Sequence, residues 1–255
     1  MIRWRFGRWE DGGLPPREAT DAWLCPEERR RLEGFRIPKR RNDWLVGRLN
    51  AKILVADAIA ERYGVRPAPA VVHIDRRPSG APVVRLLPGP STPSLPPALP
   101  LALSNSHSCG HALCGVAWLD GVTRGLRPRA IGVDLEWIEP RSDGFVRDFL
   151  TPPERAYCEA GEGRERHLRA NLAWSAKEAV LKVVQRGLSV DTYWLTCSPA
   201  PSGDGDSLAV ALSCGGEAWA PLRVTCDPRF PTHGLAFHAA WRELDGFVAT
   251  VAVGV

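Results

Sequence analysis

Apolar side chains recur at helical spacing in two long segments of the chain, residues 42–62 and 166–186. An apolar residue at every third or fourth position predicts a helix with one buried face. Asn42 or Asp43 is expected to cap the first helix, because both side chains accept hydrogen bonds from backbone N–H groups at a helix start. The pattern therefore predicts one long amphipathic helix in each half of the sequence.

Shorter elements are predicted between and around these helices. Helices are expected over residues 17–33, with Thr20 or Asp21 as the cap, and over residues 145–160. The proline-rich segment 88–100 predicts an irregular loop. Apolar runs bounded by turn residues predict strands, and they lie at residues 71–75, 82–87, 101–119 (two strands around a turn at Cys109–Gly110), 130–138 and, as several short strands, 190–255.

The order of these elements repeats along the chain. In each half a long helix is followed by strands, and the strand pair at 101–119 resembles that at 235–253, each with a glycine before an apolar strand (Gly110 and Gly246). This weak self-similarity favours an α+β fold of two similar halves, residues 1–122 and 123–255, each a small, mostly antiparallel sheet packed on a long helix. A cleft between such halves is the expected ligand site.

Composition narrows the function classes. A net charge of +4 is mild and does not suggest a nucleic-acid binder, which would show a denser basic stripe. The surplus is local, since residues 29–52 hold nine Lys or Arg and two acids, and this region suits an anion. Seven cysteines without a CxxC pair indicate a reducing compartment. The first residues have no apolar signal-peptide region, and no stretch is long enough to span a membrane, so a cytoplasmic protein is expected.

Two carboxylates stand out in the strand expected at residues 130–138. Strand alternation places Asp134 and Glu136 on one face, beside Gly132, with apolar side chains on the other. Two carboxylates so close repel unless water or a cation separates them, and Mg²⁺ prefers such oxygen ligands. A solvated acidic face would show the same alternation.

The second long helix carries a related polar stripe. Trp174, Glu178 and Lys182 share one side of it, opposite a cluster of small apolar residues. Glu178 and Lys182 are four residues apart, so they could form a surface ion pair of little energetic weight. Alternatively, Glu178 is a third oxygen ligand or a general base, and Lys182 neutralises a phosphate.

Taken together, the two segments resemble a known signature. The sequences GVDLE (132–136) and WSAKEAVLK (174–182) are similar to the paired motifs of the 4′-phosphopantetheinyl transferases, (I/V)G(I/V)D(I/V)E and W(S/T)xKE(A/S)xxK. Ser106-His107-Ser108, Gly47-Arg48 with Lys52, and the Gly80-Ala81-Pro82 turn are further landmarks. The resemblance covers roughly residues 30–190. Chain length matches the larger, monomeric type, whose two halves are related by pseudo-two-fold symmetry.

The resemblance implies a reaction and a site. Members of the family move 4′-phosphopantetheine from coenzyme A to a serine of an apo carrier protein of peptide, polyketide or fatty-acid synthesis, with Mg²⁺ bound, and release 3′,5′-ADP. It implies Asp134, Glu136 and Glu178 as metal ligands, and Glu178, Lys182 and Asp134 as catalytic residues. The residues expected to contact coenzyme A are Lys39, Arg40, Arg48, Lys52, Ser106, His107, Lys177 and Lys182.

One departure and several alternatives remain. The family commonly has a basic residue at the position of Ala81, so Arg76, Arg77 or Arg85 would have to replace that phosphate contact. A zinc cluster of His107, Cys109, His111 and Cys114 is not favoured, because its spacing matches no common closed site. The rival functions are a magnesium-dependent nucleotide pyrophosphohydrolase and a non-catalytic module that binds coenzyme A or a carrier.

Overall fold

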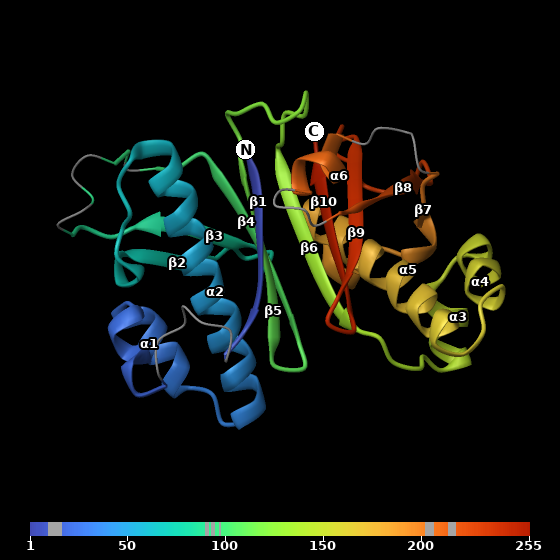
Figure 1. The fold of residues 1–255 in the computed structure, drawn as a ribbon, viewed down its shortest axis with the longest axis horizontal. Coiled ribbons are helices and arrows are strands. Elements are labelled where there is room, and N and C mark those ends of the chain that lie inside the picture. Colours follow the sequence, from blue (N-terminus) through green and yellow to red (C-terminus); the bar gives the residue numbers. More distant parts are fainter. Residues whose placement is uncertain (10–16, 90–91, 93–94, 97, 202–206, 214–217) are drawn as a thin grey trace. The chain divides into compact units, whose positions relative to one another are not determined.

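The computed structural model describes residues 1–9, 17–89, 92, 95–96, 98–201, 207–213 and 218–255. The chain divides into two compact units, one of Arg3–Trp118 and one of Leu119–Val255 together with Met1–Ile2, close to the boundary expected at residues 122–123. Each unit combines helices with antiparallel strands (Figure 1), which confirms the predicted α+β class. No helix in the described part of the chain is long and apolar enough to cross a membrane.

The N-terminal unit is built on a three-stranded sheet of order β1-β5-β4 and a two-stranded hairpin, β2-β3. The long helix α2 packs on β4 and β5, and its apolar side is buried. The bounds are β1 Ile2–Arg8, α1 Pro26–Glu33, α2 Pro38–Tyr63, β2 Val72–Arg76, β3 Pro82–Leu86, β4 Leu101–Ser108 and β5 His111–Trp118, with 3₁₀ turns at Arg17–Trp23 and Pro69–Val71.

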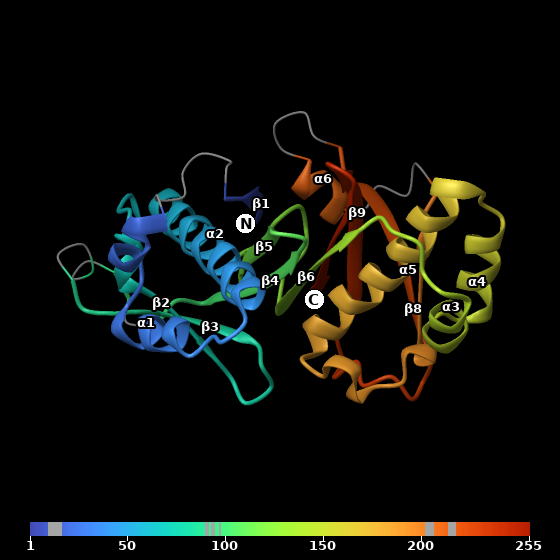
Figure 2. The ribbon, with the colours of Figure 1, turned by 90° about the horizontal axis from the view of Figure 1, so that it is seen from below.

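The C-terminal unit has a five-stranded antiparallel sheet of order β6-β10-β9-β8-β7. Its long helix α5 crosses one face of the sheet, over β6 and β10 (Figure 2). The bounds are β6 Ala130–Trp137, α3 Asp143–Phe149, α4 Pro152–Glu159, α5 Gly163–Val184, β7 Leu195–Pro199, α6 Ser207–Leu212, β8 Ala220–Cys226, β9 Phe237–Leu244 and β10 Phe247–Gly254, with 3₁₀ turns at Gly187–Ser189 and Thr192–Trp194.

Two helices begin at prolines and not at the polar residues predicted as their caps. Helix α2 begins at Pro38, after an extended Ile37, and not at the expected caps Asn42 or Asp43. A proline fits the first helical position, where an N–H group has no intrahelical partner. For the same reason the helix expected at 17–33 is a 3₁₀ turn followed by α1, whose cap is Cys25 and not Thr20 or Asp21.

Two further differences lie outside the long helices. The helix expected at 145–160 is divided into α3 and α4, because Pro152 and Pro153 begin a new helix capped by Thr151. Helix α6 was not predicted. Residues 90–91, 93–94 and 97 of the expected proline-rich loop lie outside the described residues. The strand pairs and the turn at Cys109–Gly110 are confirmed.

A buried glutamate joins three elements of the N-terminal unit. Glu28 Oε2 accepts hydrogen bonds from the backbone N–H of Cys25 (3.1 Å) and forms an ion pair with Lys52 Nζ (2.7 Å). Its Oε1 accepts from the backbone N–H of Ile74 (3.2 Å). We call this the Glu28 clamp; it connects the start of α1, the middle of α2 and strand β2.

The C-terminal unit contains the same device, the Glu154 clamp. Glu154 Oε2 accepts from the backbone N–H of Thr151 (2.7 Å) and pairs with Lys177 Nζ (2.8 Å). Its Oε1 accepts from the backbone N–H of Cys197 (2.8 Å). Each clamp thus joins a capped short helix, a long helix and the third residue of a strand, which supports the predicted repeat.

The two matching hairpins share a turn geometry as well. Cys109 and Gly110 both have positive φ (47° and 76°), and so do Asp245 and Gly246 (47° and 83°). Two central residues with positive φ are typical of the type I′ turn, whose twist matches that of antiparallel strands. The hairpins β4-β5 and β9-β10 are therefore built alike.

Candidate active site

Helix α5 lies directly against the polar face of strand β6. A Cβ added at Gly132 would be 1.9 Å from the backbone oxygen of Ala179, so a glycine is required for this close approach. Asp134 and Glu136 share that face by strand alternation. Asp134 is 4% exposed, and both carboxylates contact side chains of α5, so the alternative of a solvated acidic face is wrong.

Lys182 is held by strand β6. Its Nζ donates to Asp134 Oδ1 and to the carbonyl oxygen of Val133, both at 2.8 Å. A surface ion pair with Glu178, four residues earlier, was one of the two alternatives from the sequence. The structure instead pairs the ammonium group with a buried carboxylate of the neighbouring strand, so the pair connects the two sequence motifs.

Glu136 is fixed by two donors that were not among the predicted site residues. Arg141 Nη2 donates to its Oε2 (2.6 Å), and Trp174 Nε1 donates to its Oε1 (3.1 Å). Burial, followed by the charge of Asp134, raises the pKa of Glu136 to about 7, although Arg141 opposes this shift. Trp174 could have been found from its position on the polar stripe of α5; Arg141 follows the strand in a loop without a distinctive pattern.

Glu178 carries a buried carboxylate oxygen with an unused hydrogen-bonding capacity. Among the described residues, its Oε1 has no hydrogen-bond partner. Burial and then the charge of Asp134 raise the pKa of the Glu178 carboxyl, while Lys182 lowers it. A carboxylate in such surroundings is disposed to accept a proton or a cation.

The three carboxylates suit a divalent cation by their chemistry. All are oxygen donors, they interact electrostatically through Asp134, and Glu178 has an oxygen that awaits a partner. Across the described residues, however, Asp134, Glu136 and Glu178 do not each bring an oxygen within 4.8 Å of one another. Lys182 and Arg141 instead bind Asp134 and Glu136, and binding one ion would require the three carboxylates to draw together.

A basic pocket lies in the N-terminal unit. Arg48 from α2, Arg76 from β2 and His107 from β4 line it, together with Trp44, Gly47, Ala51, Ile74, Pro82 and Asn105. Three groups that are or can become cationic around one hollow favour a phosphorylated ligand. Arg48 and His107 were expected in this role.

Arg48 is anchored within the wall of this pocket. Its Nη1 donates to Glu28 Oε1 (3.2 Å) and to the carbonyl oxygen of Ile74, and its guanidinium lies over the ring of Trp44 (4.9 Å). Burial lowers its pKa to about 10, so the group is still charged at neutral pH. The Glu28 clamp therefore orients the arginine as well as the helix.

Arg76 is the candidate replacement for the basic residue missing at Ala81. Of the three arginines considered, Arg76 lines the pocket, whereas Arg85 pairs with Asp75 (3.6 Å). Burial and then the charge of Arg31 lower the pKa of Arg76. A guanidinium so placed gains from a phosphate partner.

The structure argues against two of the expected coenzyme A contacts. Lys52 and Lys177 have no exposed surface. Beyond the clamp glutamates, Lys52 donates to the carbonyl oxygens of Pro69 and Val72, and Lys177 to those of Phe149 and Thr192. Three donors with three acceptors leave neither ammonium group available to a ligand.

The remaining basic residues do not form one cluster. Arg40 is exposed. Lys39 lines a second pocket in the N-terminal unit, with Arg8, Trp9, Asn42, Asp43, Val46, Cys109, Gly110 and His111. Ser106 is half-buried on β4, next to His107. The unfavoured zinc cluster is not formed, since Cys114 is buried with its Sγ on the carbonyl oxygen of Gly47 (3.6 Å).

Comparisons with known proteins bear on the C-terminal unit first. Residues 130–219 match the family described as the 4′-phosphopantetheinyl transferase superfamily. The matched segment contains β6 and α5, and hence Asp134, Glu178 and Lys182. The resemblance carried by the two motifs is thereby confirmed.

Two curated relatives match most of the chain. A phosphopantetheinyl transferase of Thraustochytrium sp. is 29% identical over 193 residues, which are 69% of this chain. A Synechocystis protein named for the same activity is 27% identical over 191 residues, 66% of this chain. The matches span 59% and 65% of the relatives' own lengths.

A solved structure was also matched. The holo-(acyl-carrier-protein) synthase of Bacillus anthracis, in complex with CoA (3′,5′-ADP), aligns with 49% of this chain and 93% of its own chain. The sequence identity is 19% and the TM-score 0.37.

Proposed function

We propose that this chain transfers 4′-phosphopantetheine from coenzyme A to a serine of an apo carrier protein and releases 3′,5′-ADP. The observation that carries the proposal is the pairing of Lys182 with Asp134 (2.8 Å) beside the half-buried Glu178. This pairing joins both signature motifs within the segment that matches the superfamily. The superfamily likeness supplies the reaction, and the site geometry supplies the residues.

The chemistry assigned to the C-terminal unit needs a base and a cation. An uncharged serine hydroxyl is a weak nucleophile at neutral pH and needs a proton acceptor. Glu178 takes that proton, since its buried carboxylate has a raised pKa. The serine oxygen forms a bond to the β-phosphorus of coenzyme A as the bond to 3′,5′-ADP breaks. Lys182 offsets charge on the diphosphate.

Mg²⁺ is part of the proposal. Asp134, Glu136 and Glu178 would hold it, and a bound ion would neutralise charge on the diphosphate. Arg141 and Trp174 donate to Glu136 and so orient its carboxylate. Lys182 orients Asp134 in the same way, so two of the three proposed ligands are positioned by other side chains of this chain.

The nucleotide end of coenzyme A is assigned to the basic pocket of the N-terminal unit. Arg48, Arg76 and His107 would contact its phosphates, supported by their common position around this pocket. Lys39, Arg40 and Ser106 stay secondary candidates. As to subtype, we propose the larger, monomeric type, acting on carriers of peptide or polyketide synthesis.

The decisive experiment measures the intact mass of candidate apo carrier proteins after incubation with coenzyme A and Mg²⁺. Wild-type protein should add one phosphopantetheine, and Glu178→Gln should slow this by at least about 100-fold. Glu159→Gln, an exposed acid on α4, is the matched control and should retain the wild-type rate.

The rival functions give other results. Release of 3′,5′-ADP without any carrier would indicate a pyrophosphohydrolase. Binding of coenzyme A without a gain of mass on any carrier, and without a need for Mg²⁺, would indicate a binding module. A Glu178→Gln variant with a normal rate would overturn the assignment of the base.

A further inference from the structure

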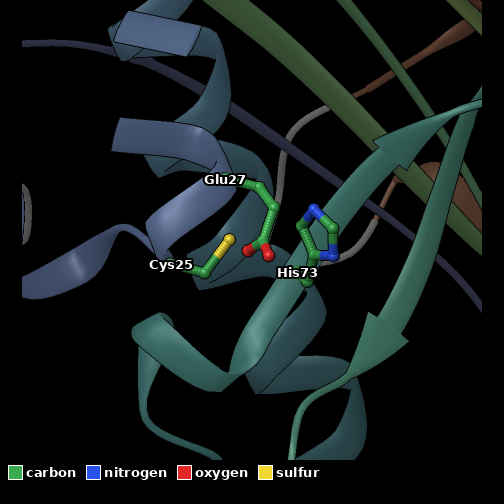
Figure 3. A group of neighbouring side chains, drawn as sticks. All are labelled: Cys25, Glu27 and His73. Carbon is green, nitrogen blue, oxygen red and sulfur yellow. The ribbon is translucent and has the colours of Figure 1, made fainter. Parts of the chain in front are cut away.

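Three side chains with metal-binding atoms meet at the start of helix α1, and none of them is among the residues assigned above. Cys25 is the cap of α1, Glu27 lies in its first turn, and His73 lies on strand β2 (Figure 3). One ligand atom from each lies within 4.8 Å of the other two. The Glu27 carboxylate points toward both the sulfur and the imidazole ring.

The backbone beneath this group is fixed by contacts that do not involve the three side chains. Glu28 accepts hydrogen bonds from the backbone N–H of Cys25 and of Ile74, and Ile74 directly follows His73. The clamp therefore sets the start of α1 against β2. A metal site needs such a frame, because its ligands must stay close to their binding geometry when the ion is absent.

The donor set selects the kind of ion. A thiolate, an imidazole and a carboxylate are ligands of Zn²⁺, whereas Mg²⁺ takes oxygen ligands. Three protein ligands leave a fourth tetrahedral position for water. The Glu27 side chain also forms an exposed ion pair with Arg30 (3.5 Å). An exposed ion pair of this kind contributes little to stability, so it would not prevent Glu27 from binding a metal ion.

We propose that Cys25 Sγ, a carboxylate oxygen of Glu27 and a ring nitrogen of His73 bind one Zn²⁺ in the N-terminal unit. Burial raises the pKa of the Cys25 thiol, so binding releases its proton and strengthens as the pH rises. The ion would tie α1 to β2. Because Glu28 and Ile74 also hold Arg48, it would stiffen one wall of the basic pocket.

Cobalt titration of the full chain tests the proposal. Co²⁺ replaces Zn²⁺ in such sites and gives a thiolate-to-metal absorption band only when a cysteine is a ligand. With Mg²⁺ and a metal-free phosphine reductant present, one equivalent of Co²⁺ should produce this band, and one equivalent of Zn²⁺ should remove it. The carboxylate site of the C-terminal unit cannot give a thiolate band.

Variants identify the ligands. Cys25→Ser should remove the band, and His73→Gln should weaken Co²⁺ binding by more than about tenfold. Cys109→Ser is the matched control, because Cys109 is exposed and its carbonyl oxygen contacts His111; it should keep the band. Circular dichroism checks that each variant folds. If Cys25→Ser does not fold, His73→Gln is the variant that tests the site, because His73 is only half-buried.

Three results would overturn the site: wild-type protein without a thiolate band, a band that survives Cys25→Ser, or a band lost equally in Cys109→Ser. None of them depends on transferase activity, so failure of this site and failure of the proposed reaction are separable.

Discussion

The Glu28 clamp and the Glu154 clamp are built from the same parts, yet they serve different surroundings. In the N-terminal unit, the residue four positions before the clamp lysine is Arg48, which lines the basic pocket. In the C-terminal unit that position is a buried alanine, Ala173. The residue after the lysine is the buried Ile53 in one unit and Glu178 in the other.

The difference lies in charge balance. Glu28 faces two cations, Arg48 and Lys52, so the N-terminal unit has a cationic surplus that suits an anion. In the C-terminal unit, three carboxylates face Lys182 and Arg141, so a negative charge is left over. The shared device therefore lies beside a basic pocket in one unit and beside a cluster of carboxylates in the other.

The largest expected effect comes from removing a clamp lysine. Lys177→Met should destabilise the fold by about 3–5 kcal/mol, because the buried Glu154 loses its counter-charge. Lys52→Met should cost less, because Glu28 keeps its ion pair with Arg48. Urea unfolding measures this. Lys39→Met, an exposed matched control, should change stability by less than about 0.5 kcal/mol. A mild effect at Lys52 with loss of coenzyme A binding would reverse its assignment to the clamp.

Glycine positions sharpen the comparison next. Gly132→Ala should cost about 2 kcal/mol or more, since the added methyl meets the backbone of α5 at 1.9 Å. Gly47→Ala meets no backbone atom, only the side chains of Asn105 (Nδ2, 3.4 Å) and His107 (Cδ2, 3.8 Å), and within a helix it should stabilise by up to about 1 kcal/mol. Thermal unfolding of both variants checks the contrast. Equal effects would contradict the close approach at Gly132.

The basic pocket predicts a smaller, functional effect. Arg76→Met should raise the KM for coenzyme A about tenfold and leave kcat nearly unchanged, because a charge-assisted hydrogen bond to phosphate is lost. Steady-state transfer kinetics measure it. Arg77→Met, the exposed neighbour outside the pocket lining, is the control. If Arg77→Met had the larger effect, Arg77 and not Arg76 would make the phosphate contact.

The pH dependence of stability is the smallest effect. The folded-state pKa of Glu136 is about 7, above its ordinary 4.5, through burial and the charge of Asp134. Between these values the folded protein keeps a proton that the unfolded chain has lost, so stability falls as the pH rises and then levels off. Urea midpoints with a chelator present should show a loss of about 1 kcal/mol between about pH 5 and pH 8. Glu136→Gln should flatten the dependence of stability on pH. If the slope stayed unchanged in this variant, another group would be responsible for the pH dependence.

Periodicity predicted the elements that bury whole apolar faces. The helices α2 and α5, the hairpin β4-β5 and the strand β6 all follow from it, as does the shared face of Asp134 and Glu136. Helix starts were less predictable, because Pro38 and Pro152 compete with nearby polar residues as start signals.

The site was predicted in part. Motif spacing brought Asp134, Glu178 and Lys182 together, whereas the roles of Lys52 and Lys177 were misjudged. The sequence of a motif does not show whether its lysine binds a phosphate or a buried glutamate. The glutamate partners here, Glu28 and Glu154, lie 24 and 23 positions earlier in the chain, outside the motifs. Arg141 was missed because it acts from a loop.

The contact between Gly132 and the backbone of Ala179 bears on how this chemistry could be moved to another protein. Strand and helix touch there without an intervening side chain, so their separation is set by main-chain atoms alone. Grafting Asp134 and Glu178 onto a host with an ordinary strand-to-helix distance would leave the two acids too far apart to cooperate. A graft would therefore have to include the strand, the helix and the glycine at position 132 that lets them touch.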